Sequence, residues 1–134
     1  DLYGPGRMVI IYTLASVASL FLGEHVDVHG VEWAGDALPT GLELLPEAFR
    51  EAGYRTFGFS SNLHISARFG FDRGFSRFDF VDPEVGRRPH HEVPAALLEG
   101  LAEELRREPE RPFFGYVHLM PPHAPYDPPP PFDQ

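Results

Sequence analysis

The chain has 134 residues, enough for one modest domain that buries about two thirds of its unfolded surface. Apolar residues make up 43% and aromatic residues 13% of the sequence, which indicates a packed core rather than disorder. The net charge is −9 with no Lys/Arg stripe, so we expect no nucleic-acid partner. There is no cysteine, and no apolar run reaches the roughly 18 residues of a membrane span. Compartment and oligomeric state stay open.

The first predicted unit is a short strand followed by a helix with hydroxyl residues at its start. Residues 7–12 contain an apolar run and are expected to form the strand. Thr13 and Ser16 follow at the junction, where a hydroxyl faces the unpaired N–H groups of the helix start and the positive end of its dipole. Such a hydroxyl suits an oxyanion or a metal-activated alkoxide, and it equally suits a plain N-cap. The apolar positions behind it recur at helical spacing: Val17, Ala18, Leu20 and Phe21.

The next unit runs from loop to helix to strand. Residues 24–40 contain glycine and proline without a hydrophobic period, and are predicted to form a loop. Residues 42–52 have apolar positions at helical spacing, with Gly53 as the C-terminal stop. Residues 54–59 are rich in aromatic and β-branched side chains and predict a strand. A helix, a glycine and a strand make half of an α/β unit, and the implied sheet is parallel.

Residues 66–80 mix phenylalanine, arginine and glycine. An aromatic and basic mixture is also found in stacking platforms for nucleic acid. The surrounding acidity and the regular glycines favour a compact loop whose phenylalanines fill the core: Phe69, Phe71, Phe75, Phe78 and Phe80. Pro94 then opens a helix with one leucine-rich face, which is predicted to pack on the sheet.

The last predicted strand spans residues 112–119 and leads into a proline-rich segment. Ligands of open α/β sheets lie at the carboxyl ends of the strands, so His123, just past this strand and held between prolines, is well placed for chemistry. His118, inside the strand, is predicted to be a structural histidine, with a substrate contact as the alternative. The four prolines at 128–131 block ladder pairing and make a stiff, extended exit.

Three segments, in this order, resemble the sulfatase family of the alkaline phosphatase superfamily. The nucleophile segment of that family reads nucleophile-x-Pro-Ser-Arg-x-x-Leu-x-Thr-Gly and is followed by His-Gly-Val. Residues 13–23 are similar to it, and residues 29–31 read His-Gly-Val, which puts Thr13 at the nucleophile. Residues 52–56 match the family's Ala-Gly-Tyr-x-Thr, and residues 122–125 match its Pro-His-x-Pro, whose histidine binds the ester oxygens or assists the leaving group.

The chain departs from the family pattern at several chemically important positions. Ser60 and Ser61 replace a Gly-Lys pair, so the cation that binds sulfate is missing or is supplied from elsewhere. His64 falls one residue beyond the family histidine and is predicted to lie at a helix start or on the surface. No cysteine is present to form the formylglycine of most sulfatases. Three residues stand where the family has Pro, Arg and Thr: Ala15, Val17 and Leu22.

The resemblance implies an α/β fold, a partial alkaline-phosphatase-like sandwich with a mostly parallel sheet and flanking helices. Residues 1–134 are expected to be a single partial sulfatase-like domain. Its nucleophile segment would cover about residues 8–23 and its proline-rich exit residues 121–134.

The resemblance also implies a set of site residues. Thr13 and His123 would be catalytic, with Thr13 also touching a metal ion. His29, Asn62 and His118 would bind substrate, Asn62 by offering its amide to an ester oxygen. Parallel strands joined by right-handed crossovers bring their carboxyl ends together, so Thr13 and His123 should lie on one edge of the sheet, on the order of 5–10 Å apart. His29 and Asn62 should border that edge.

The implied activity is metal-dependent hydrolysis of a small-molecule or glycan sulfate ester by a hydroxyl nucleophile in a full-length parent. Two alternatives stay open: a Thr-dependent phosphodiester or phosphonate-ester hydrolase or phosphotransferase, and a non-catalytic sulfatase-like scaffold. The divalent metal would be Ca or Mg in a sulfatase and Mn or Zn in a phosphoester-directed enzyme. The family's Asp-Asp and Asp-His-Gly metal ligands are absent from the sequence, so most ligands are expected outside this chain, and the chain alone is expected to be inactive.

Overall fold

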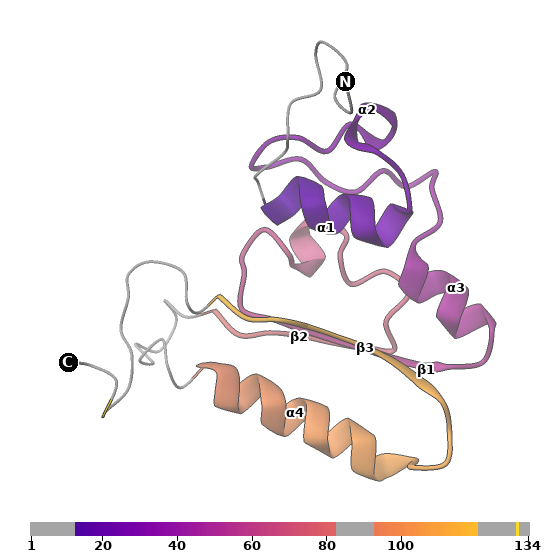
Figure 1. The fold of residues 1–134 in the computed structure, drawn as a ribbon, viewed down its shortest axis with the longest axis vertical. Helices are drawn as coiled ribbons and strands as arrows, with labels where there is room; N and C mark the ends of the chain where they lie inside the picture. Colours follow the sequence, from indigo (N-terminus) through magenta and orange to yellow (C-terminus); the bar gives the residue numbers. More distant parts are fainter. Residues whose placement is uncertain (1–12, 83–92, 121–130, 132–134) are drawn as a thin grey trace.

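A three-stranded parallel sheet lies at the centre of the computed structural model, which describes residues 13–82, 93–120 and 131 (Figure 1). The central strand is β1 (Arg55–Ser60), which lies between β2 (Arg77–Phe80) and β3 (Phe113–His118). Ser60 is in register with Phe80 on one side and with His118 on the other. The three strands therefore end level with one another, at one carboxyl edge of the sheet.

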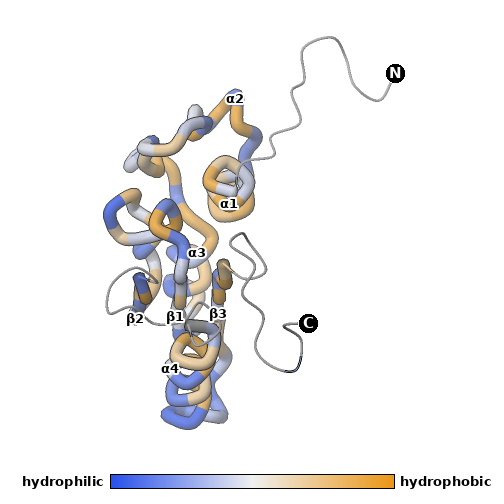
Figure 2. Tube along the Cα trace, turned by 90° about the vertical axis from the view of Figure 1, so that its left-hand side faces the viewer, coloured by the Kyte–Doolittle hydropathy of each residue, from blue (hydrophilic) through white to orange (hydrophobic). Residues whose placement is uncertain are grey.

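Helices cover both faces of this sheet, as Figure 1 shows. The longest, α4 (Val93–Arg107), covers one face, where Phe57 and Phe59 of β1 pack with Leu97. The other face is covered by α1 (Thr13–Leu22) and α3 (Leu45–Glu51). Along the tube of Figure 2, α1 is mostly apolar, whereas α4 mixes apolar and polar residues, as expected for a helix with one face in water.

The helix α4 approaches the sheet most closely at Gly100. A Cβ atom at this position would lie 2.6 Å from Cε1 of Phe59. Phe59 is only 1% exposed, so its ring has little room to move. A glycine in the middle of a helix normally weakens it, but here it allows the backbone to rest directly on an aromatic ring.

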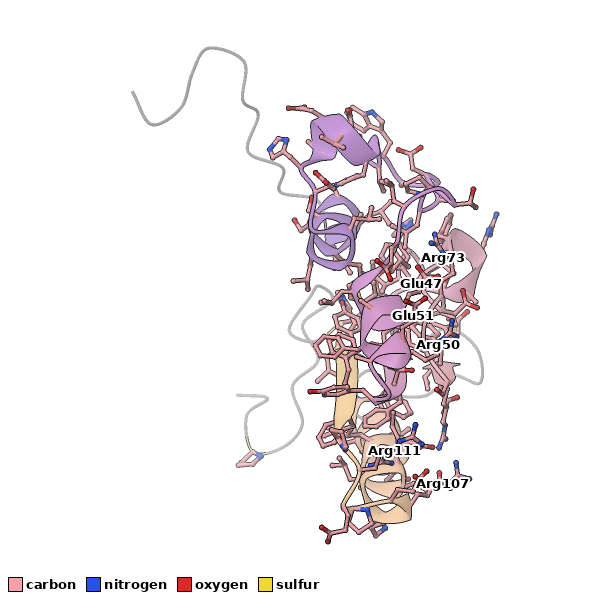
Figure 3. The ribbon with its side chains drawn as sticks, turned by 90° about the vertical axis from the view of Figure 1, so that its right-hand side faces the viewer. Glu47, Arg50, Glu51, Arg73, Arg107 and Arg111 are labelled. Carbon is pink, nitrogen blue, oxygen red and sulfur yellow. The ribbon has the colours of Figure 1, made fainter. Side chains whose placement is uncertain are left out.

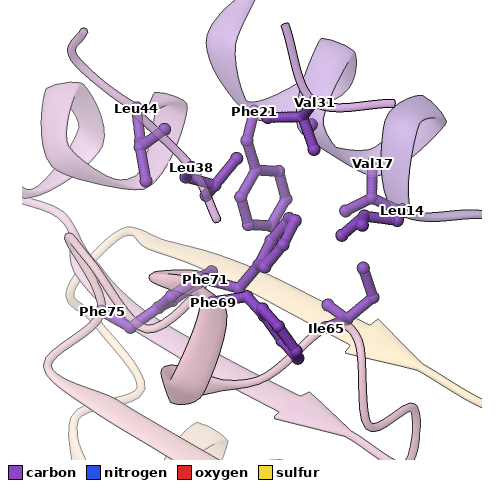
Figure 4. Close-up of a cluster of buried hydrophobic side chains, with 11 residues drawn as sticks. Leu14, Val17, Phe21, Val31, Leu38, Leu44, Ile65, Phe69, Phe71 and Phe75 are labelled. Atoms are coloured by element: carbon purple, nitrogen blue, oxygen red, sulfur yellow. The ribbon is translucent and has the colours of Figure 1, made fainter. Parts of the chain in front are cut away.

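The larger core cluster fills the space between the sheet and α1, and Figure 4 shows its side chains. Phe21 of α1 meets Phe71 and Phe75 with ring centroids 5.8 and 5.9 Å apart. Phe69 also belongs to this cluster and Phe78 packs against it, while Phe80 is half-buried. Three of the five phenylalanines predicted to fill the core are therefore buried, and the prediction of a structural segment is confirmed for them.

Arg73 ties the phenylalanine-rich segment to the start of α3 (Figure 3). Its guanidinium lies 3.0 Å from a carboxylate oxygen of Glu47 and donates hydrogen bonds to the carbonyl oxygens of Pro39 and Leu42 at 2.8 and 2.6 Å. The five N–H donors of arginine lie in the plane of the guanidinium and point outward in different directions, so a single side chain can bridge three segments. This contact holds the loop before α3 against the loop after β1.

The predicted strands at 54–59 and 112–119 and the helix opened by Pro94 are confirmed. The helix predicted over 42–52 is shorter, because the Glu47 carboxylate accepts the backbone N–H of Leu44 at 2.8 Å and so caps α3 at that point. Two expectations of loop structure were wrong. Residues 24–40 contain the one-turn helix α2 (Val26–His29), and β2 lies in the segment predicted to be a compact loop. The short 3-10 helix Ala67–Phe69 also lies in that segment.

The strand predicted at 7–12 and the proline-rich exit lie outside the described residues, apart from Pro131. Within the described ranges, no helix is long and apolar enough to cross a membrane.

Candidate active site

The carboxyl edge of the sheet is held together by Ser61, the first residue after β1. Its backbone N–H donates to the carbonyl of His118 at 3.0 Å, and its hydroxyl donates to the same carbonyl at 3.3 Å. The hydroxyl also accepts the N–H of Met120 at 3.0 Å. Ser61 therefore joins the ends of β1 and β3, and this position, where the resemblance has a lysine, serves the backbone instead of an anion.

Asn62 follows in the same turn and is 7% exposed. Its backbone N–H donates to the Ser60 hydroxyl at 3.1 Å, and its side-chain Oδ1 accepts the backbone N–H of His64 at 2.9 Å. Its Nδ2 lies 3.4 Å from Nε2 of His118. Two of the predicted substrate-binding residues, from positions 56 apart in sequence, thus meet at the edge where β1 and β3 end.

His118 is also paired on its other side. Its Nδ1 lies 2.8 Å from the hydroxyl of Tyr116, two residues earlier on the same face of β3. Burial lowers the pKa of His118, so the ring is neutral at pH 7, and burial raises the pKa of Tyr116, so the phenol stays protonated. Tyr116 was not among the predicted site residues, although the period of two in a strand places it beside His118.

Thr13 is the first residue of α1 and is exposed, as expected for a hydroxyl at a helix start. The next residue, Leu14, is buried in the same cluster as Ile65, which belongs to the loop after β1. Figure 4 shows Leu14 and Ile65 facing each other at the end to which the strand arrows point. The first turn of α1 therefore lies over the carboxyl edge, above the loop that carries Asn62.

Two departures from the family pattern lie inside α1. Ala15 is fully buried, and Val17, where the family has arginine, is 8% exposed and belongs to the core cluster. Val17 points toward Leu14 and Ile65 in Figure 4. The position carries packing here rather than a charge next to Thr13.

His29 is buried against the second half of α1. Its Nδ1 accepts the N–H of Val31 at 3.0 Å, so the proton is on Nε2, which donates to the hydroxyl of Ser19 at 2.8 Å. Burial lowers its pKa, as does the nearby His25, while Glu24 acts in the opposite direction. Ser19 is six residues beyond Thr13, about 9 Å along the axis at about 1.5 Å per residue, so the structure pairs His29 with the middle of α1 rather than with its first turn.

His64 and His123 complete the predicted histidines. His64 lies in a turn and is half-buried, with its ring 6.0 Å from that of Phe69 and its buried Nδ1 without a hydrogen-bond partner in the described part of the chain. The structure places His64 in a turn rather than at a helix start, with its half-buried ring against Phe69. His123 lies outside the described residues, so its distance from Thr13 stays a prediction.

The described side chains do not fit a metal site. Across residues 13–82 and 93–120, no three His, Asp or Glu side chains come close enough together to hold an ion. By itself, the Thr13 hydroxyl offers only one weak oxygen ligand.

A sequence model of the sulfatase family matches residues 11–134, which is nearly the whole chain. The chain therefore belongs to the sulfatase family, whose members generally use a divalent metal and act on sulfate esters. Its parallel sheet with flanking helices is consistent with part of an alkaline-phosphatase-like fold. A comparison with curated protein sequences gives no significant match.

Proposed function

We propose that the chain is part of a sulfatase domain that hydrolyses a small-molecule or glycan sulfate ester, with Thr13 as the nucleophile. The observation that carries this proposal is the position of the first turn of α1 above the carboxyl edge, over the loop with Asn62. Ester oxygens that approach this edge would meet the free N–H groups of the helix start and the amide of Asn62.

In this proposal, attack of Thr13 Oγ on sulfur forms a sulfo-threonine and breaks the bond between sulfur and the leaving oxygen. The alcohol is released, and its oxygen gains a proton equivalent to the one that the Thr13 hydroxyl loses. His123 is proposed to assist at the leaving oxygen. Water then cleaves the sulfo-threonine and releases sulfate. A threonine hydroxyl has a pKa far above neutrality, so this attack needs activation that no described side chain supplies, and we expect it from parts of the protein beyond this chain.

A non-catalytic scaffold is the second candidate, and two observations favour it. Val17 and Ser61 occupy positions where the resemblance has cations, and here they serve the core and the backbone. A protein that kept the scaffold without turnover would not need cations at these two positions.

The test measures hydrolysis of 4-nitrophenyl sulfate and bis-4-nitrophenyl phosphate with Ca, Mg, Mn or Zn. We expect no turnover by the 134-residue chain, and sulfate-ester turnover by a version extended into its flanking coding sequence. Thr13→Ala should lower that turnover roughly a thousandfold or more, whereas Thr13→Ser and the neighbouring control Ser16→Ala should retain it. An extended protein that turns over equally well with Thr13→Ala would refute the proposed nucleophile, and one inactive with every ester would favour the scaffold.

A further inference from the structure

The orientation of the Asn62 carboxamide is set by the backbone beside it. A backbone N–H can only donate, so the atom that accepts the N–H of His64 at 2.9 Å must be the oxygen, Oδ1. The nitrogen, Nδ2, is therefore the atom that faces His118. A main-chain contact therefore distinguishes the two ends of this amide.

This orientation decides the proton position on His118. Nδ2 carries only hydrogens, so Nε2 of His118 must present its lone pair to accept from it, across 3.4 Å. The single proton of the neutral ring then sits on Nδ1 and is donated to the Tyr116 hydroxyl oxygen at 2.8 Å. If the proton were on Nε2 instead, two donors would face each other between Asn62 and His118.

We infer that Tyr116 and His118 are positioning residues that hold the Asn62 amide so that its second N–H is the donor offered to an anionic ester oxygen. This inference rests on the proposed function, and it changes the role expected for His118. A neutral ring whose Nε2 lone pair points at Asn62 has no hydrogen to give to a sulfate oxygen. The lowered pKa of His118 agrees with a ring that stays neutral.

An anionic ester oxygen at this edge needs a donor, because the residue that replaces the family's lysine does not supply one. Ser61 stands where the resemblance has a lysine, and its hydroxyl is occupied by His118 and Met120. Nδ2 has two hydrogens and makes one hydrogen bond within the described part of the chain, and the inference assigns the second hydrogen to the ligand. An amide fixed at both ends gives up little orientational freedom when it binds an anion.

The first test reads the proton position directly and needs no ligand. In a ¹⁵N-labelled chain at pH 7.5, long-range ¹H–¹⁵N spectra should show His118 with a protonated Nδ1 and an unprotonated Nε2. Asn62→Ala should shift His118 toward the Nε2–H form that prevails in free histidine, and Tyr116→Phe should weaken the Nδ1–H form. Tyr54→Phe is the matched control, because the Tyr54 ring packs on Phe49 and no hydrogen bond joins its hydroxyl to a described residue.

The second test asks what the Asn62 amide binds. Asn62 and Gln134 carry the only side-chain amides in the sequence, so the NH₂ region contains one reporter and one internal control. Titration with inorganic sulfate should shift the Asn62 signals and leave those of Gln134 unchanged. His118→Phe should weaken the sulfate affinity seen at Asn62 about fivefold, the effect of losing one hydrogen bond.

Each outcome decides the inference. An Nε2–H form of His118 in the unmodified chain would overturn it, and so would the expected tautomer without any sulfate shift at Asn62. Retained ester turnover in Thr13→Ala would refute the proposed nucleophile and leave both NMR results untouched. The failure of the inference and the failure of the proposed function are therefore distinguishable.

Discussion

At the scale of single residues, His29 and His118 each have both ring nitrogens within hydrogen-bond distance of another group. The backbone N–H of Val31 puts the proton of His29 on Nε2, whereas the inferred contact with the Asn62 amide puts that of His118 on Nδ1. Protonating either ring would place two donors face to face, in a buried site for His29 and in a half-buried one for His118. Both pKa values are accordingly lowered by burial.

Because these two histidines have lowered pKa values, the folded chain should become less stable as the pH falls. In the unfolded chain both rings bind protons below their ordinary pKa of 6.5, while in the folded chain they do so only at lower pH. The unfolded state therefore gains protons first, and the free energy of unfolding should decrease as the pH drops below about 6.5. Urea unfolding at pH 8 and pH 5.5 measures the change.

The variant His118→Phe separates the contribution of the His118 ring from that of the other groups that titrate between the two pH values. His118→Phe should show a smaller loss of stability between the two pH values than the unmodified chain does. If the two proteins lose the same amount, His118 is not held neutral in the fold.

Val17 stands where the family has an arginine, four residues after the nucleophile. Val17 is 8% exposed and packs in the core, whereas Ser16, one position earlier, is exposed. Val17→Arg should lower the free energy of unfolding by about 3 kcal/mol or more, because the core offers no partner for a buried charge. Ser16→Arg is the control and should stay within about 0.5 kcal/mol. Equal stability of the two variants would mean that the position can still carry the family arginine.

At the scale of the elements, α4 and β1 meet through the contact of Gly100 with Phe59. An alanine normally stabilises a helix by about 1 kcal/mol relative to glycine. Here its methyl group would lie 2.6 Å from a ring carbon of Phe59, and overpacking costs about 1–3 kcal/mol. We expect Gly100→Ala to lower the melting temperature by a few degrees, with Glu99→Ala on the exposed side as the control. A rise with Gly100→Ala would show that α4 can move away from the sheet.

The strands and helices that could be predicted are those whose residue types or hydrophobic spacing are typical of that element. Residues 55–60 and 113–118 are rich in aromatic and β-branched side chains and were found as strands, and the leucine face of α4 was found as a helix. The strand β2 was not, because Arg77–Phe80 alternates polar and apolar residues over only four positions, inside a glycine- and phenylalanine-rich segment that was predicted to be a compact loop. Its pairing with β1 makes it a strand, and such pairing is a tertiary effect.

At the scale of the whole molecule, the parallel topology explains what could be predicted of the site. Level strand ends bring Asn62 to His118, and the packing of Leu14 on Ile65 brings the start of α1 over the same edge. Motif reasoning placed His29 at that edge too, whereas its contacts with Ser19 and Val31 pair it with the middle of α1. Tyr116 was missed because an alternating strand pattern does not say which neighbour a hydroxyl will bind.

If the start of α1 and the segment after β3 form one ester site, Thr13 and His123 lie close together, and the distance between them can be measured. The chain has no cysteine, so Thr13→Cys with His123→Cys gives a clean pair for cross-linking by the short thiol reagent dibromobimane. We expect efficient cross-linking, with the two side chains on the order of 5–10 Å apart. Thr13→Cys with Glu99→Cys is the control, since α4 covers the opposite face of the sheet from α1, and it should not cross-link. A Thr13–His123 pair that cross-links no better than this control would mean that the start of α1 and the segment after β3 do not form one site.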